Sequence, residues 1–245
     1  MRRAVRLLIA SLCLSASSQS VHGQDAGAAP TRDVREIVQR LAFDPGTFFP
    51  SPHIKDHAVV RIAYTGDDYA WPVYAIAVAE GCVDGENIPR DHCASRLRAR
   101  MVRAPAVDAP SSPRHRGSRL IARLMEDGST SPAQIQASLQ GMGVEWVEAD
   151  LRDCPGAVQA LARSADATWV PEAIANPRPG DELSGMVLHA DIVQVEFKQY
   201  ARLASYQGWI AEGSPAAWAV EFASALEPCW RPASVQAPWL RQTLP

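Results

Sequence analysis

Apolar residues near the start of the chain recur at the spacing of a helix. Four of them would share one helix face: Val34, Ile37, Val38 and Leu41. Thr31 is suited to cap such a helix, and Pro45 follows shortly after its end. The pattern predicts an amphipathic helix ahead of the first strand.

The period then changes from helical to extended. Residues 58–64 and 73–79 are rich in β-branched and aromatic side chains, and a polar turn lies between them, which predicts an antiparallel pair of strands. Arginine and apolar residues alternate strictly over 96–101. We interpret this segment as a third strand whose arginines face outward, although the spacing of Leu97 and Met101 also suits a helix.

The second half of the chain contains both patterns. Helices are predicted at four capping residues: Ser118, Ser131, Asp153 and Ser214. Strands are predicted over 144–151, 186–197 and 203–210. Strands come in neighbouring runs and do not alternate regularly with helices. This order indicates an α+β fold, with antiparallel sheet elements and helices packed on one side.

The N-terminus has the three-part order of a secretory signal peptide. A basic start precedes an apolar run over 7–16, and a polar stretch leads to Gly23, after which we predict cleavage. The run is shorter than the roughly 20 residues needed to span a membrane. Leu12 is too bulky to precede a lipid-bearing Cys13, so a lipoprotein is not expected. The mature chain is therefore predicted to be periplasmic or secreted.

The mature chain is predicted to start with a disordered tether over 24–30, followed by a single domain over 31–245. Prolines, alanines and serines gather over 104–117, which makes this segment a possible internal subdivision. The precursor has a net charge of −3, and loss of three arginines with the signal peptide makes it −6. An acidic chain without another long apolar run is expected neither to bind nucleic acid nor to span a membrane.

Four cysteines remain after the signal peptide, an even number suited to two disulfides in an oxidising compartment. Three pairings are possible. We favour Cys82 with Cys93, across a polar loop, and Cys154 with Cys229. Four free thiols or a metal site are the alternatives. Because no C-x-x-C occurs and the histidines are scattered, we predict no metal and no cofactor.

His189 and Asp191 are the residues that come closest to a catalytic pair. On a strand they would face the same side, where the carboxylate could orient the imidazole as a general base. No G-x-S-x-G, S-x-x-K or H-E-x-x-H motif accompanies them. The same face continues through Val193 and Val195, so a hydrogen-bonded structural pair is the interpretation we favour.

Charge is distributed unevenly along the chain. Nine arginines occur over 90–123 against two aspartates, and twelve acidic residues occur over 126–196 against three arginines. The candidate binding residues lie in the basic segment: Arg96, Arg98, Arg100, Arg103, Arg116 and Arg119. They could bind an acidic protein or an anionic envelope component. Alternatively, the basic segment pairs with the acidic segment inside one fold.

Trp230 and Trp239 lie in the proline-rich tail after Cys229. Tryptophan is favoured at binding hot spots, so these two are candidates for exposure. A tail that packs back on the body of the protein would explain them equally well.

These features predict a non-enzymatic exported protein that binds another macromolecule, as an inhibitor, immunity-type or envelope accessory protein would. The alternative is a cell-envelope hydrolase that uses His189 and Asp191. The choice depends on whether that pair opens into a cleft and whether the arginines are available to a partner.

Overall fold

The computed structural model describes residues 28–51, 58–66, 71–82, 88, 93–107, 114–166, 191–199 and 202–241. The predicted signal peptide, the first part of the predicted tether and His189 lie outside these ranges. No helix among the described residues is long and apolar enough to cross a membrane.

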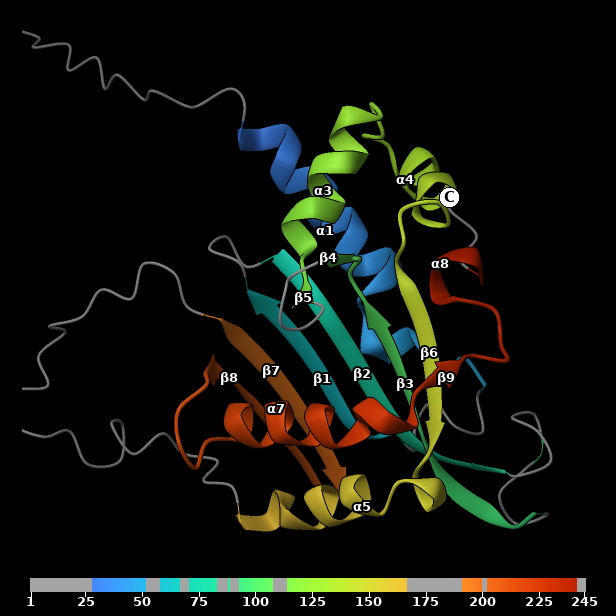
Figure 1. Ribbon diagram of the computed structural model, residues 1–245, viewed down its shortest axis with the longest axis vertical. Helices are drawn as coiled ribbons and strands as arrows, with labels where there is room; N and C mark the ends of the chain where they lie inside the picture. The colour runs from blue at the N-terminus through green and yellow to red at the C-terminus, as the bar shows by residue number, and fades with distance from the viewer. Residues whose placement is uncertain are drawn as a thin grey trace, which may run out of the picture.

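A seven-stranded antiparallel sheet forms the centre of the fold (Figure 1). Its strands are β1 (Ala58–Gly66), β2 (Trp71–Cys82), β3 (Ser95–Arg103), β6 (Glu145–Asp150), β7 (Ile192–Gln199), β8 (Arg202–Trp209) and β9 (Arg231–Pro232). Their order is β8-β7-β1-β2-β3-β6-β9, so β8 and β9 are the two edges. A separate pair consists of β4 (Ala106–Val107) and β5 (Arg114–His115). Because β3 pairs with β6, the strands before and after the 104–117 segment belong to one sheet.

Helices and short 3₁₀ turns connect these strands. The helices are α1 (Ala28–Ala42), α3 (Gly117–Glu126), α4 (Pro132–Leu139), α5 (Pro155–Ala162), α7 (Pro215–Leu226) and α8 (Pro238–Arg241). The 3₁₀ turns are η1 (Pro45–Thr47), η3 (Leu151–Asp153), η4 (Arg163–Asp166) and η5 (Glu227–Cys229). The predicted α+β class with an antiparallel sheet is confirmed.

Thr31 lies inside α1, which begins at Ala28, so the cap predicted there is wrong. Two of the other four predicted helix caps are present. The Ser131 hydroxyl accepts a hydrogen bond from the backbone N–H of Gln134 in a capping box. The Ser214 hydroxyl accepts one from the backbone N–H of Ala217 at 3.1 Å. The prediction for Ser118 is wrong, because α3 already begins at Gly117. A Cβ on Gly117 would come within 2.2 Å of the Pro72 carbonyl oxygen, so the chain needs glycine where α3 meets β2.

The prediction that Asp153 caps α5 is also wrong. Cys154 holds the N-cap position and makes no side-chain capping bond. Asp150 instead caps the preceding turn η3, where its Oδ1 accepts from the Arg152 amide at 3.1 Å. Asp153 lies inside that 3₁₀ turn, which leaves Cys154 at the start of the helix.

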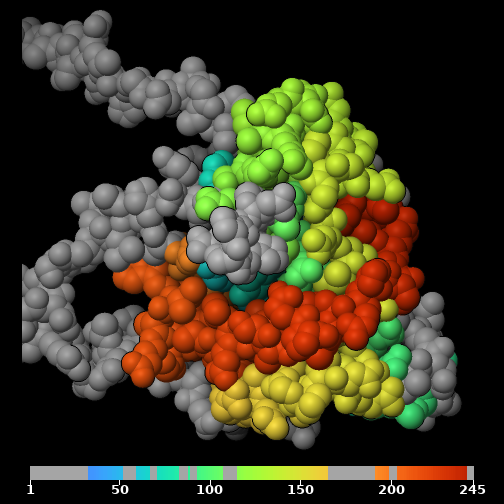
Figure 2. Space-filling view, viewed as in Figure 1, coloured from blue at the N-terminus to red at the C-terminus, as the bar shows by residue number. Residues whose placement is uncertain are grey.

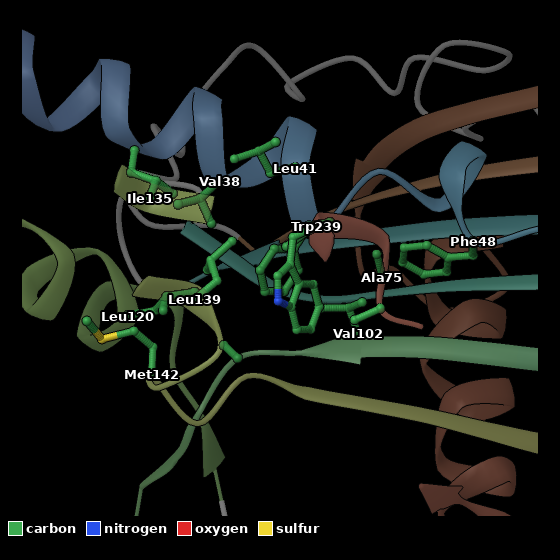
Figure 3. Close-up of a cluster of buried hydrophobic side chains, with 14 of the residues drawn as sticks. Val38, Leu41, Phe48, Ala75, Val102, Leu120, Ile135, Leu139, Met142 and Trp239 are labelled. Carbon is green, nitrogen blue, oxygen red and sulfur yellow. The ribbon is translucent and has the colours of Figure 1, made fainter. Parts of the chain in front are cut away.

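Helices α1, α3, α4 and α8 cover one face of the sheet, called the α1 face below. The side chains of Ala75, Ala77 and Ala79 on β2 belong to this layer, and their small size lets the overlying side chains approach the sheet. Apolar residues of all four helices meet in one cluster (Figure 3): Val38, Leu41, Leu120, Ile135, Leu139 and Trp239. The predicted apolar face of the first helix is therefore buried.

Helices α5 and α7 cover the opposite face, called the α7 face (Figures 1 and 2). Trp218 stacks on Phe222 with ring centroids 5.5 Å apart, and its indole N–H donates to the Ala160 carbonyl at 2.7 Å, which joins the two helices. Helices thus lie on both faces and not on one side as predicted. Successive residues of β2, such as Ala75 and Ile76, are both apolar and both buried, on opposite faces.

Arg100 is the largest fully buried side chain in the described residues, with a relative exposure of 0%. Its Nη1 donates to the Phe48 carbonyl at 2.9 Å, and its Nε lies 3.6 Å from Glu148 Oε2. The guanidinium carbon lies 4.5 Å from the centroid of the Phe49 ring and 5.9 Å from that of Trp146. A carboxylate, a carbonyl and two aromatic rings therefore replace water around this charge.

The prediction that the arginines of this strand face outward is wrong for Arg100. Strict alternation places them on one side of β3, and that side is the α1 face, at the centre of the sheet. Ala77 is the β2 residue opposite Arg100, and its short side chain leaves room for the guanidinium.

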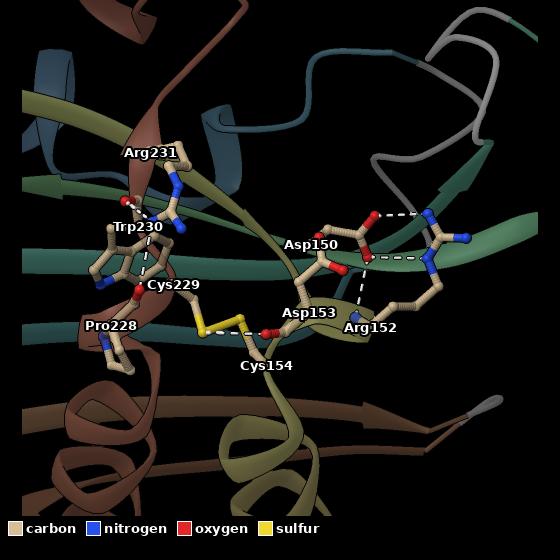
Figure 4. The surroundings of a disulfide bond; sticks show 8 residues. All are labelled: Asp150, Arg152, Asp153, Cys154, Pro228, Cys229, Trp230 and Arg231. Atoms are coloured by element: carbon tan, nitrogen blue, oxygen red, sulfur yellow. Dashed lines mark hydrogen bonds and ion pairs between the residues drawn. A yellow bond between two sulfur atoms is a disulfide. The ribbon is translucent and has the colours of Figure 1, made fainter.

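The described residues contain two disulfides, and both favoured pairings are confirmed. Cys82 and Cys93 are 11 residues apart in sequence, with Cα atoms 5.6 Å apart. Cys154 and Cys229 are 75 residues apart, with Cα atoms 6.0 Å apart. The second bond ties the start of α5 to the turn that follows α7 (Figure 4).

The C-terminal tail packs back on the body of the protein. Trp230 is 9% exposed and Trp239 is 4% exposed, so the suggested exposure of these two side chains is wrong. The tail is held by β9, which pairs with β6, and by the Trp146 indole N–H, which donates to the Val235 carbonyl at 2.9 Å.

Glu148→Gln is expected to lower the free energy of unfolding by about 3 kcal/mol, because it leaves the Arg100 guanidinium buried without its carboxylate. Glu145→Gln on the same strand is the matched control. The Glu145 side chain is 39% exposed against 16% for Glu148. Its loss should be about 1 kcal/mol or less. Urea denaturation followed by tryptophan fluorescence measures both, and equal losses would contradict the role assigned to Arg100.

Removal of the Cys154–Cys229 bond by a double alanine substitution should cost about 4 kcal/mol of stability, against about 3 kcal/mol for Cys82–Cys93. The difference follows from the longer loop that the first bond closes in the unfolded chain. Urea denaturation of the two double variants, each with its other disulfide intact, gives the comparison. A larger loss for the shorter loop would reverse the expected order.

Candidate functional site

Acidic residues of the same chain bind the first two candidate arginines on the α1 face. Arg96 Nη1 lies 2.6 Å from Asp150 Oδ2, and Arg98 Nη2 lies 3.3 Å from Glu148 Oε2. The pairing of β3 with β6 sets both contacts, because Arg98 is opposite Asp150 and Arg100 is opposite Glu148. The result is a ladder of alternating charge along the two neighbouring strands β3 and β6.

The charge ladder shifts the carboxyl groups within it. Burial by itself would raise the pKa of Glu148, but hydrogen bonds from Ser234 and the guanidinium groups of Arg98 and Arg100 outweigh it and lower this pKa. For Asp150, burial again opposes the shift, while hydrogen bonds from Arg152 and the charge of Arg96 lower the pKa. Both groups are therefore stabilised as carboxylates.

Arg103 makes a separate set of contacts. Its Nε donates to Glu145 Oε2 at 2.6 Å, and its Nη1 lies 3.2 and 3.1 Å from the two carboxylate oxygens of Glu227. These bonds connect β3 and β6 with the turn that ends α7. Four of the six candidate arginines thus bind acidic groups of this chain.

Arg116 and Arg119 differ from the other four candidates because both side chains are exposed, at the start of α3. The structure does not bring them together with Arg96, Arg98 or Arg100. The basic segment and the acidic segment pair with each other at four positions, which is the alternative that the sequence left open.

Asp191 lies at the start of β7 and is exposed, while His189 lies outside the described residues. The Tyr64 hydroxyl donates to Asp191 Oδ2, and the Tyr64 ring stacks on Tyr74 with centroids 4.8 Å apart. Burial raises the pKa of Tyr64 above its usual value, and the hydrogen bond to Asp191 is a second, smaller cause of the same shift. Burial likewise raises the pKa of Tyr74. This arrangement keeps both phenols protonated and uses the Asp191 carboxylate as an acceptor.

A groove of about 590 Å³ lies on the α1 face, between α1 and the strands β1, β7 and β8. Its volume falls within the range of small-ligand sites. The N-terminal lining comes from α1 and the residues that follow it: Arg35, Glu36, Gln39, Arg40, Phe43, Asp44 and Pro45. The strands supply the remainder: Arg61, Ala63, Thr65, Ile192, Gln194, Glu196 and Gln207.

The floor of the groove carries paired polar groups. Arg61 on β1 is opposite Glu196 on β7, and their side chains form an ion pair of 3.4 Å with 32% and 30% exposure. Gln194 is opposite Gln207, and both side chains are exposed. Each amide can donate and accept, as a peptide group does. The floor can therefore hold a ligand that has amide groups and charges of both signs.

The end of the groove near η1 is preorganised by local hydrogen bonds. Asp44 Oδ1 accepts from the Gly46 amide at 2.8 Å and caps the turn, and Gln39 Nε2 donates to the Phe43 carbonyl at 3.1 Å. These two side chains fix the backbone at the end of α1, which forms this end of the groove.

The candidate residues taken from the sequence did not include any residue of this groove. A signal was present in β7, where Gln194 and Glu196 alternate with the buried residues Val193 and Val195. The polar positions of this strand define a solvated sheet face. Only the pairing of β7 with β1 shows that α1 stands beside that face.

No protein-family model, no curated protein and no solved structure matches this chain. Within the described ranges, no group of three or more His, Cys, Asp or Glu side chains is arranged to hold a metal ion.

The charge ladder predicts a loss of stability in acid. A carboxyl whose pKa is lowered on folding stabilises the protein above its ordinary pKa, and this contribution is lost as the pH falls through the lowered value. The free energy of unfolding should start to fall as the pH drops below 4.5, the ordinary pKa of a glutamate. Urea denaturation over a pH series should show a shallower fall in Glu148→Gln and Asp150→Asn. The same slope in both variants and the wild type would contradict the assignment.

Proposed function

We propose that this chain is an exported, non-enzymatic binding protein that holds a polypeptide segment of another protein in the groove beside α1. Export is supported by the basic and apolar order of residues 1–23 and by the two disulfides, which suit a periplasmic or secreted protein. Inhibitor, immunity-type and envelope accessory proteins all fall within this class.

One observation carries the proposal: a groove of about 590 Å³ whose sheet floor has exposed amides beside an ion pair. Gln194 and Gln207 offer donors and acceptors to a peptide backbone, while Arg61 and Glu196 can exchange their mutual contact for charged groups of the ligand. Because Gln207 lies on the edge strand β8, the groove extends to the edge of the sheet.

A partner bound through the arginine cluster has less support. Arg96, Arg98, Arg100 and Arg103 would have to leave carboxylates of this chain before they could bind an acidic protein or an anionic envelope component. The hydrolase alternative has no observation in its favour: Asp191 accepts a hydrogen bond from Tyr64, and His189 lies outside the described residues.

Ala63→Phe is the variant that tests the groove, because Ala63 lies on its floor and a phenyl ring there would fill it without changing charge. The matched control is Ala122→Phe, at an exposed position of α3 outside the groove. Immobilised mature protein is incubated with a periplasmic extract, and the retained proteins are identified by mass spectrometry. A partner held by the wild type and by Ala122→Phe should be lost from Ala63→Phe.

A second variant allows the groove to be tested even if Ala63→Phe does not fold. Gln194→Ala combined with Gln207→Ala removes the floor amides from exposed positions, and the urea midpoint of each variant confirms that it is folded. Retention of the same proteins by the wild type and all three variants, or retention of none, would overturn the proposal.

A further inference from the structure

Strand β8 forms one edge of the sheet and has features that do not depend on the proposed function. Within the described part of the chain, β8 pairs with β7 on one side only, so the backbone groups along its other side are open to a further strand. Natural sheet edges are usually protected by charges, prolines, bulges or short length. Between Leu203 and Trp209 there is no charged residue and no proline, and the register with β7 is continuous.

Exposed apolar side chains gather on this strand. Five large hydrophobic residues are exposed among those described, and three of them lie on β8 or directly after it. Leu203 is 67% exposed, Trp209 is 54% exposed and Ile210 is 43% exposed. Removing such side chains from water favours association, and an open strand edge directs it.

The spacing of these side chains indicates which strand would pair with the open side of β8. Leu203 and Trp209 lie three residues before and three residues after Tyr206. Both are on the same side of the strand as Gln207, which lines the groove. An antiparallel copy of β8, related by a two-fold axis through Tyr206, would place Leu203 of each chain directly opposite Trp209 of the other. Such aromatic–aliphatic pairs are stabilising across strands.

We propose that two copies of this chain dimerise by antiparallel pairing of their β8 strands about Tyr206. The two sheets then form one continuous sheet of fourteen strands. On the other face the two Tyr206 side chains lie side by side at the axis, and small residues flank them, since Ala204 of one copy is opposite Gly208 of the other. The interface is self-complementary, as a two-fold contact requires. An unrelated strand would not need this symmetry.

The size of the contact sets its strength. The exposed parts of Leu203 and Trp209, which face each other across the axis, set an upper limit of roughly 250 Å² per copy, or about 500 Å² for the dimer, in addition to the strand backbones. This area is at the lower end of specific interfaces, and dissociation in the micromolar range is expected. The contact is apolar and backbone-mediated, so raised salt should not weaken it.

The dimer also extends the groove beside α1. In this register Ser205 of the second copy lies opposite Gln207, on the α1 face, next to the groove floor. Each copy therefore supplies one side chain to the edge of the other copy's groove. A ligand that reaches the sheet edge would contact both chains.

Sedimentation velocity of the mature protein over a hundredfold concentration range tests the proposal. The wild type should shift from monomer to dimer. L203K combined with W209K puts two lysines opposite each other at both ends of the strand, and should raise the dissociation constant about tenfold or more. L203K combined with W209E is the matched control, because it puts opposite charges in the same places and should restore the dimer.

Cross-linking tests the register separately. Tyr206→Cys places a thiol opposite itself across the two-fold axis, at a distance that a disulfide can span, so mild oxidation should give a covalent dimer on a non-reducing gel. Ala204→Cys is the control, since its partner position is Gly208 and its two thiols lie too far apart. A monomer at all concentrations, equal dissociation constants for the two charge variants, or equal cross-linking at both positions would overturn the proposal.

Discussion

The Arg100 guanidinium is a charge without water at the centre of the sheet, and its neighbours must all be in place before it can be buried. Phe48 supplies a carbonyl, Glu148 a carboxylate, and Trp146 an aromatic ring. These three come from the segment after α1 and from β6. The same contacts fix the chain next to η1, where Phe43 and Pro45 form the end of the groove. A charge that is expensive to bury thus anchors the segment that follows α1 to the sheet.

The α1 face has two halves with different chemistry. Over β2 and β3 it is lined by alanines, Val102 and the buried Arg100, and the overlying helices exclude water. Over β1, β7 and β8 the corresponding positions include arginine, glutamate and glutamine, and the floor remains partly exposed. The groove lies at the boundary between the part of the α1 face that the helices cover and the part that solvent reaches. The position of the groove therefore follows from where the helical layer stops.

Local patterns were sufficient to predict much of this fold. The apolar face of α1, the β1–β2 hairpin and the serine caps at Ser131 and Ser214 each depend on residues close together in sequence. The number of cysteines left three pairings open, and the favoured one is the pairing that the structure contains. Burial of Arg100 could not be predicted in this way, because alternation shows that two faces differ and does not show which is covered. The groove was missed for a related reason: Arg61 and Glu196 are 135 residues apart and meet only through strand pairing.

The bond between Cys154 and Cys229 makes a closed ring of the chain from α5 to the end of α7. This ring contains β7 and β8, which supply part of the groove floor and one edge of the sheet. A protease that cuts the backbone once within the ring would leave the two fragments covalently attached, and the sheet would still hold both. The molecule can thus be nicked once between these cysteines without losing a piece.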